Sequence, residues 1–187
     1  IFYQSMNLAP GTYQLTFDGK GTANQYRPLL YIGINQWSKV YGEHFLKNFG
    51  FGEEWKTATV QFTIPESAAD ANTGLAPVYV ALWTSNNSFA PESEMQFDNF
   101  AVRKLLKATA NLSNAALSAK ITEVAQGLAY ENTVIAAEGF EVSKVTVTMG
   151  GTEVANAYDA ATGKISIDAV TGDLNIKVET TPKNLFA

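Results

Sequence analysis

Apolar and polar residues alternate along short runs of this chain, and this period of two is the feature that most constrains its fold. Tyr13, Leu15 and Phe17 alternate with polar residues, and Ala58–Ile64 repeats the pattern. Because successive side chains of a β-strand point to opposite faces, such runs predict half-buried strands. Clusters of Gly, Pro, Asn and Asp separate the runs, and helical periodicity is nearly absent. The sequence therefore predicts an all-β fold.

The runs place the expected strands in two sets. In the first half of the chain we expect strands at residues 2–4, 13–17, 30–34, 55–64, 78–83 and 95–102. Residues 36–53 are expected to be irregular, and residues 66–76 to form a loop. In the second half we expect strands at residues 132–136, 142–149, 164–167 and 174–179. Residues 109–112 and 117–121 fit either strands or one weak helix.

The aromatic residues divide the chain into two parts. All but four of them, including all three tryptophans, lie in residues 1–103, and they stop after Arg103. A length of 187 residues suits two small domains. We therefore predict domains at 1–103 and 104–187, with any recognition surface in the first. The start at Ile1, inside an expected strand, leads us to expect a mature or trimmed piece that lacks the first strand of its first domain.

Charge and cysteine content exclude several classes of function. The net charge is −5 and no basic stripe is present, so we expect neither nucleic-acid binding nor attachment to anionic membranes. No apolar run is long enough for a membrane span. The chain has no cysteine, which excludes disulfides, thiolate metal sites and thiol catalysis.

Catalytic candidates are few. His44 is the only histidine, and no nucleophile motif accompanies it. The adjacent Glu53 and Glu54 are expected to be solvated turn residues, because neighbours on a strand point to opposite faces. The spacing of Glu92 and Glu94 would place both on one face of a strand, but a loop beside Pro91 explains them as solvated residues. The sequence predicts a protein that is not an enzyme, although a glycosidase that uses carboxylates stays an alternative.

Aromatic side chains carry the strongest binding signal. Tyr31, Tyr79 and Trp83 alternate with core residues on their strands, so they belong to the face turned away from the core. Flat rings on such a face can stack on the apolar side of a sugar, while amide side chains hydrogen-bond its hydroxyl groups. The predicted carbohydrate-binding residues are Tyr31, Tyr79, Trp83, Trp37, Asn35 and Gln14. The alternative is that segment 36–53 folds over this face and buries the rings.

Three motifs in the first half resemble a known family. They are Leu8–Leu15 with the preceding Tyr3-Gln4, the run Trp55–Ile64, and Phe97–Val102. In this order they resemble the carbohydrate-binding jelly rolls of the galactose-binding-like superfamily. The resemblance implies glycan binding. It also implies that Asp98, in the last motif, is a candidate ligand of a structural calcium ion, which is the only cofactor suggested for this chain.

The second half resembles a small bacterial immunoglobulin-like domain. The resemblance rests on Val145–Gly151 and Val170–Leu174, together with Tyr130, Gly139-Phe140, Tyr158 and Gly163–Ile165. Such domains are spacers in bacterial surface proteins and phage tail proteins. The expected fold is therefore a jelly-roll β-sandwich followed by a smaller immunoglobulin-like β-sandwich.

Together these observations predict a non-catalytic carbohydrate-binding or adhesion module with an immunoglobulin-like spacer. We expect it in a secreted or surface-anchored bacterial protein or a phage appendage, with an extracellular or cell-surface location. Its expected partners are a glycan and other domains or subunits of a larger surface assembly. The alternative is a structural subunit of a fibre, pilus or tail, in which a partner chain completes the first sheet.

Overall fold

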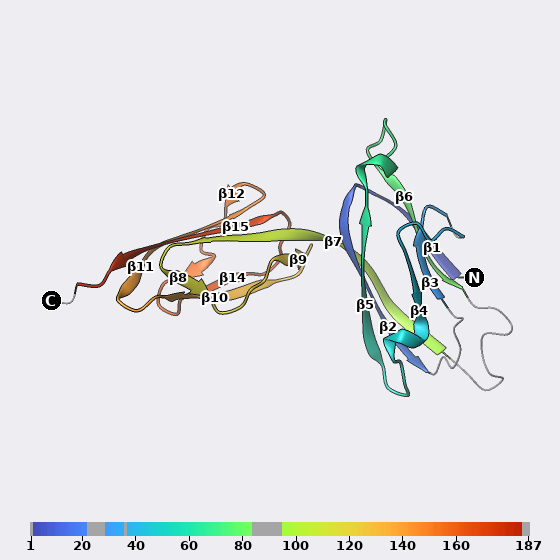
Figure 1. Ribbon diagram of the computed structural model, residues 1–187, viewed down its shortest axis with the longest axis horizontal. Helices are drawn as coiled ribbons and strands as arrows, with labels where there is room; N and C mark the ends of the chain where they lie inside the picture. The colour runs from blue at the N-terminus through green and yellow to red at the C-terminus, as the bar shows by residue number, and fades with distance from the viewer. Residues whose placement is uncertain (1, 22–28, 36, 84–94, 185–187) are drawn as a thin grey trace. The chain divides into compact units, whose positions relative to one another are not determined.

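The computed structural model describes residues 2–21, 29–35, 37–83 and 95–184. This part of the chain is all-β apart from two short 3-10 helices (Figure 1). The chain divides into two compact units, Ile1–Lys104 and Leu105–Ala187. The boundary between them falls inside one strand, β7 (Met95–Leu112), which contributes residues to a sheet in each unit.

The first unit consists of two facing sheets (Figure 1). One sheet has the order β1-β6-β3-β4, and the other has the first part of β7 beside β2 and then β5. The strands are β1 (Phe2–Leu8), β2 (Gly11–Gly21), β3 (Leu29–Gly33), β4 (Gly42–Phe45), β5 (Lys56–Ile64) and β6 (Ala76–Trp83). The 3-10 helices are η1 (Leu46–Phe49) and η2 (Glu66–Ala68).

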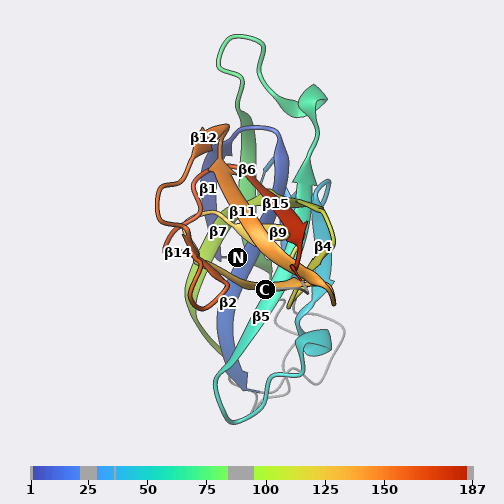
Figure 2. The same cartoon turned by 90° about the vertical axis from the view of Figure 1, so that its left-hand side faces the viewer.

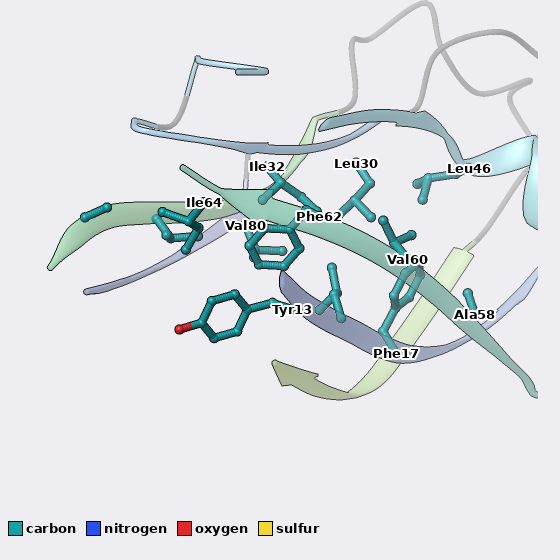
Figure 3. Close-up of a cluster of buried hydrophobic side chains, with 13 residues drawn as sticks. Tyr13, Phe17, Leu30, Ile32, Leu46, Ala58, Val60, Phe62, Ile64 and Val80 are labelled. Atoms are coloured by element: carbon teal, nitrogen blue, oxygen red, sulfur yellow. The ribbon is translucent and has the colours of Figure 1, made fainter. Parts of the chain in front are cut away.

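Alternation of side chains builds the core of this unit. On β2 and β5 every second residue is buried, and the residues between them turn toward solvent. Leu15 pairs with Val60 of β5 and with Val102 of β7, so apolar side chains meet across neighbouring strands. Leu30 and Ile32 of β3 close the core from the opposite sheet (Figure 3). The apolar area removed from water between the two sheets is the main stabilising contribution.

Many rings of the first unit are structural. Phe17 is fully buried, and its ring is surrounded by four other phenylalanine rings at centroid distances of 5.1 to 6.2 Å. These neighbours are Phe49, Phe51, Phe97 and Phe100. The high aromatic content of residues 1–103 is therefore in part a packing feature of the core, and only some of the rings are available to a ligand.

Two local expectations differ from the structure, and one alternative that the sequence left open is decided. Segment 36–53 is not wholly irregular, because Gly42–Phe45 forms β4 on the outer edge of β3 and Leu46–Phe49 forms η1. The last strand of the first half does not end at 102 but continues as β7 to Leu112. Residues 109–112 are thus strand and not helix. Residues 117–121 contain the end of a short strand, β8 (Ala115–Leu117), and no helix.

The second unit also consists of two sheets over one core. One has the order β13-β14-β10-β8, and the other contains β12, β11, β15 and the last part of β7, with β9 paired to β7. The strands β11 and β15 lie side by side (Figure 2). Besides β8, the strands are β9 (Glu123–Ala125), β10 (Tyr130–Ala136), β11 (Phe140–Met149), β12 (Thr152–Glu153), β13 (Tyr158–Asp159), β14 (Lys164–Ile167) and β15 (Leu174–Pro182).

One polar side chain is buried in this second core. Asn132 is 6% exposed, and its amide oxygen accepts hydrogen bonds from Ser118 Oγ and from the backbone N–H groups of Ala119 and Thr133. Its Nδ2 donates to the carbonyl of Ala119 at 2.8 Å and to Tyr130 Oη at 3.1 Å. Because every polar atom of the amide has a partner, the side chain holds segment 118–119 against β10.

Candidate functional site

The outer face of the β1-β6-β3-β4 sheet carries several of the rings that the sequence points to. Ala81 pairs with Tyr31 on one side and with Tyr3 on the other. Tyr79 pairs with Gly33 and Ser5, and Trp83 pairs with Leu29. Paired residues share a face of a sheet, and Val78 and Val80 of β6 belong to the core. Tyr3, Tyr31, Tyr79 and Trp83 therefore all lie on the side turned away from the core.

Tyr31 is covered on this face. It is 7% exposed and lies in a small buried cluster with Leu29 and Ala81. The ring of Trp83 stacks beside it at a centroid distance of 6.4 Å, and Lys39 Nζ lies 5.0 Å from the centre of the tyrosine ring. Tyr31 stays a predicted carbohydrate-binding residue, and only a small part of its ring is open on this face.

The cover over Tyr31 comes from the segment between β3 and β4. Lys39 forms an ion pair with Glu43 of β4, and this hydrogen bond raises the pKa of the lysine. The cation is thereby held over the ring, an arrangement that a negative π-face favours. Lys39 thus covers part of the outer face, as the alternative drawn from the sequence expects for segment 36–53, whereas Tyr3 of β1 is exposed.

A second pair of rings is accessible where β1 meets β6. Tyr3 is 53% exposed, and its ring lies 5.7 Å from that of the half-buried Tyr79, with 38° between their planes. Ser5 and Asn7 follow Tyr3 on the same face of β1, and both are exposed. We call these four residues the tyrosine platform. It offers two tilted aromatic surfaces with a hydroxyl and an amide beside them.

Trp37 and Asn35 lie in the turn that follows β3. Trp37 is the most exposed of the described tryptophans, at 63%. Its backbone N–H donates to Asn35 Oδ1 at 2.9 Å, and the N–H of Ser38 donates to the carbonyl of Asn35 at 3.0 Å. Ser38 packs so closely on Gly33 that a Cβ there would lie 2.4 Å from the serine carbonyl oxygen. The amide oxygen of Asn35 is therefore used in shaping the turn that presents Trp37.

Gln14 lies on a different surface. It belongs to β2, where it pairs with Gln61 of β5 and Arg103 of β7 on the outer face of the second sheet. The same surface carries Trp55, 48% exposed, with Lys20 Nζ 5.2 Å from its ring. The register expected for Gln14 is observed, but its sheet is the opposite one, so Gln14 and the tyrosine platform cannot contact one small ligand together.

Asp98, the calcium candidate, takes part in a strand irregularity. It pairs with Asp18 of β2 next to a shift in register, and its Oδ1 accepts the N–H of Asn99 at 2.7 Å. Asp18 accepts from Asn99 Nδ2 at 2.7 Å and from Thr57 Oγ1 at 2.6 Å, and these hydrogen bonds lower its pKa.

The surroundings of Asp98 offer few ligands for a calcium ion. Calcium takes six to eight oxygen ligands, whereas the described residues nowhere gather three acidic, histidine or cysteine side chains. The carboxylates of Asp18 and Asp98, whose oxygens already accept hydrogen bonds, do not make up that ligand set. Calcium at Asp98 stays a prediction, and no step below depends on it.

The catalytic candidates have structural surroundings. His44 is half-buried on β4, with its ring 6.3 Å from that of Phe49. Burial lowers its pKa, and its Nε2 has no hydrogen-bond partner among the residues that the structure describes. Glu53 and Glu54 are exposed in a bend before β5. Glu92 and Glu94 lie outside the described residues.

A groove opens at the edge of the first unit, between β1 and β7. It has a volume of about 610 Å³, within the range of about 300–1,000 Å³ usual for ligand pockets. None of the described residues that line it is charged. They are Tyr3, Gln4 and Met6 of β1, Leu15 of β2, Val80 and Leu82 of β6, and Phe100 and Val102 of β7.

Of the tyrosine platform, the sequence pointed to Tyr79 but not to Tyr3, Ser5 or Asn7, and it did not indicate this groove. The signal for Tyr3 was present, because Tyr3, Ser5 and Asn7 alternate with Met6 and Leu8, and the last two pack against the core. The sequence pattern of a single strand does not indicate a groove, because a groove forms only where the edge strands of two sheets lie next to each other.

Comparisons with family models, with characterised proteins and with solved structures found no match for this chain. Among the residues that the structure describes, no helix has the length and apolar character needed to cross a membrane.

Proposed function

We propose that the first unit is a non-catalytic carbohydrate-binding module whose binding surface is centred on the tyrosine platform. The observation that supports this is the tilted pair formed by Tyr3 and Tyr79 on an outward sheet face. Two rings 5.7 Å apart can contact the apolar faces of a sugar or of neighbouring sugars in a chain. Ser5 and Asn7, exposed beside them, are suited to hydrogen-bond the hydroxyl groups.

Such a surface binds with modest affinity. One stacked ring contributes roughly 1–3 kcal/mol, by analogy with stacking of nucleobases on aromatic side chains. Tyr79 packs against Tyr3 before any ligand arrives, so part of the ordering cost is already met in the unliganded protein. We therefore expect dissociation constants in the micromolar to millimolar range, which correspond to about −8 to −4 kcal/mol.

The wider proposal concerns architecture and location. We propose that the first unit is a jelly-roll sandwich and the second an immunoglobulin-like spacer, in an adhesive protein that is secreted or held at a cell surface. The all-β character of both units, each with one core between sheets, supports this. The second unit has few aromatic residues, as suits a spacer without a binding surface of its own.

The proposal is tested by glycan binding of matched variants. On a broad glycan array, the parent protein is expected to bind a defined set of glycans, and Tyr79→Ala and Tyr3→Ala to weaken that binding at least tenfold. Trp55→Ala, which removes a comparably exposed ring from the opposite sheet, is expected to leave it unchanged. Equal binding by Tyr79→Ala and the parent, or loss of binding in Trp55→Ala alone, would reject the platform.

A second candidate function is that of a structural subunit in a fibre, pilus or tail. The observation that favours it is the turn after β3, which exposes Ile34, Trp37 and Val40 together. Three large apolar side chains within seven residues are typical of a contact surface. Light scattering coupled to size-exclusion chromatography distinguishes the two functions, since a monomer at every concentration argues against self-assembly.

A further inference from the structure

The edges of the two sheets in the first unit are protected to different degrees. An exposed strand edge invites pairing with another chain, and proteins usually protect it with charges, proline, a bulge or a short strand. β4, at one edge of its sheet, has only four residues and carries Glu43. β5, at the edge of the other sheet, begins with Lys56. β7 has a bulge next to Asp98.

β1 has none of these protections. Its seven residues, Phe2–Leu8, include no charged residue and no proline, and they pair with β6 without a break in register. In the part of the chain that the structure describes, no strand pairs with its other edge. Backbone N–H and C=O groups of alternate residues point to that edge, because both groups of one residue point the same way in an antiparallel strand.

The groove lies directly beside this edge. Its far wall is formed by Phe100 and Val102 of β7, and Phe100 is 44% exposed although it stacks on the buried Phe17. A strand added to β1 would direct every second side chain toward this wall. The described lining is uncharged, and its polar side-chain groups are the amide of Gln4 and the hydroxyl of Tyr3. A sugar would leave most of its hydroxyl groups without partners there.

One positively charged residue of β7 follows the described lining on the same face of the strand. Lys104 follows Val102 on the same face of β7, and its side chain extends beside Gly11, where a Cβ would lie 2.9 Å from Lys104 Cε. No described acid forms an ion pair with Lys104. An occupant with a negative group near Lys104 would be complementary to it.

We propose that the groove between β1 and β7 binds an extended segment of a partner polypeptide. The segment pairs with β1 as an added strand, places alternate apolar side chains against Phe100 and Val102, and carries an acidic residue near Lys104. A seven-residue edge accommodates a segment about 23 Å long, at about 3.3 Å per residue. Main-chain hydrogen bonds supply affinity, and the alternate side chains supply selectivity. This proposal does not depend on glycan binding.

The test uses the full 187-residue chain and a phage-displayed library of random nonapeptides. Selected peptides are expected to have apolar residues at every second position and an acidic residue at one end. Phe100→Ala is expected to weaken the binding of a selected peptide at least tenfold. Trp55→Ala removes a ring of similar exposure on the other side of the sheet and is expected to leave the binding unchanged. With the Lys104→Glu variant, the selected peptides are expected to carry a basic residue at that end in place of the acidic one. An unfolded variant could not produce this change.

Hydrogen exchange locates the bound peptide. Alternate amides of residues 3–7 are expected to exchange more slowly when a selected peptide is added. The proposal is overturned if no peptide is enriched, if enriched peptides lack the alternation, or if these amides are not protected. Protection that rises with protein concentration alone would also overturn it, because a second copy would then occupy the edge. The Tyr79→Ala variant is expected to bind the peptides like the parent protein. Failure of the peptide proposal can therefore be told apart from failure of the proposed glycan site.

Discussion

Tyr31 and Tyr79 lie on the same face of the same sheet, and their surroundings give the two rings different access. A cation from the turn after β3 covers Tyr31, while the ring of Tyr79 packs beside the exposed ring of Tyr3. A stacking residue must keep one face open to solvent, so the nearly buried ring of Tyr31 is less suited to stacking than that of Tyr79. At the scale of single residues, binding on this face is therefore expected to depend on Tyr3 and Tyr79.

His44 makes the stability of the first unit depend on pH. Burial lowers its pKa from the ordinary value of about 6.5, so the unfolded chain takes up the proton at a higher pH than the folded one. The contribution to stability is complete above about pH 6.5 and is lost as the pH falls through that value toward the folded pKa. Urea unfolding followed by tryptophan fluorescence at pH 7.5 and 5.5 measures this loss.

The matched variant for this prediction is His44→Leu, which keeps an apolar contact for Phe49 and cannot be protonated. We expect its unfolding midpoint to change less between the two pH values than that of the parent. An equal change in both proteins would show that other groups cause the pH dependence.

Asn132 tests the buried hydrogen-bond network of the second unit. Asn132→Ala leaves the N–H and C=O of Ala119 without their side-chain partner, and we expect a loss of about 1–3 kcal/mol in unfolding free energy. Because this unit contains no tryptophan, the measurement is far-ultraviolet circular dichroism in urea. Asn175→Ala, at an exposed position of β15, is the control. Equal stability of the two variants would contradict the structural role of Asn132.

At the scale of elements, the alternation of residues was enough to predict most strands. β2, β5, β6 and β14 lie where the pattern indicates, because a strand with one buried face must repeat with a period of two. β4 could not be predicted, since its four residues show no such repeat and it forms by pairing with β3. Residues 109–112 were ambiguous because the Ala and Ser content of the surrounding region, up to residue 121, also suits a helix. Pairing with β15 decides in favour of a strand.

The candidate site shows a second limit of the same reasoning. Alternation tells which face of its own strand a side chain occupies, but not which sheet that strand joins. Gln14 and Tyr79 were both correctly expected to leave the core, yet they lie on the outer faces of opposite sheets. Whether a neighbouring segment covers a ring likewise depends on tertiary packing. The contact of Lys39 with the ring of Tyr31 is not indicated by the sequence pattern of β3 or β4.

The irregularity in β7 gives a prediction at this scale. Asn99 has a φ of 55°, a left-handed conformation that Asn tolerates and a β-branched residue does not. Asn99→Val is expected to lower the unfolding free energy by about 1–3 kcal/mol. Asn99→Gly, which suits the backbone but also loses the hydrogen bond to Asp18, is expected to be less destabilised. Tryptophan fluorescence in urea reports on this unit, and a parent-like Asn99→Val would contradict the account.

At the scale of the whole molecule, the uneven distribution of aromatic residues has two causes. One group of rings surrounds Phe17 and stabilises the core of the first unit, and another lies on the outer sheet face. The second unit builds its core mainly from Val, Ile and Leu, with Tyr130 as its one fully buried ring among the described residues. The sequence could reveal the uneven distribution, but dividing the rings between core and surface required the packing of the two sheets.

The central claim, that a glycan binds on the tyrosine platform, is tested most directly by nuclear magnetic resonance titration of the labelled protein. The ligand is the glycan that binds best on the array. We expect the largest amide and side-chain shifts at Tyr3, Ser5 and Tyr79, with the face around Gln14 and Trp55 unchanged. Shifts centred on that opposite face or on the second unit, or no glycan-dependent shift at all, would contradict the account.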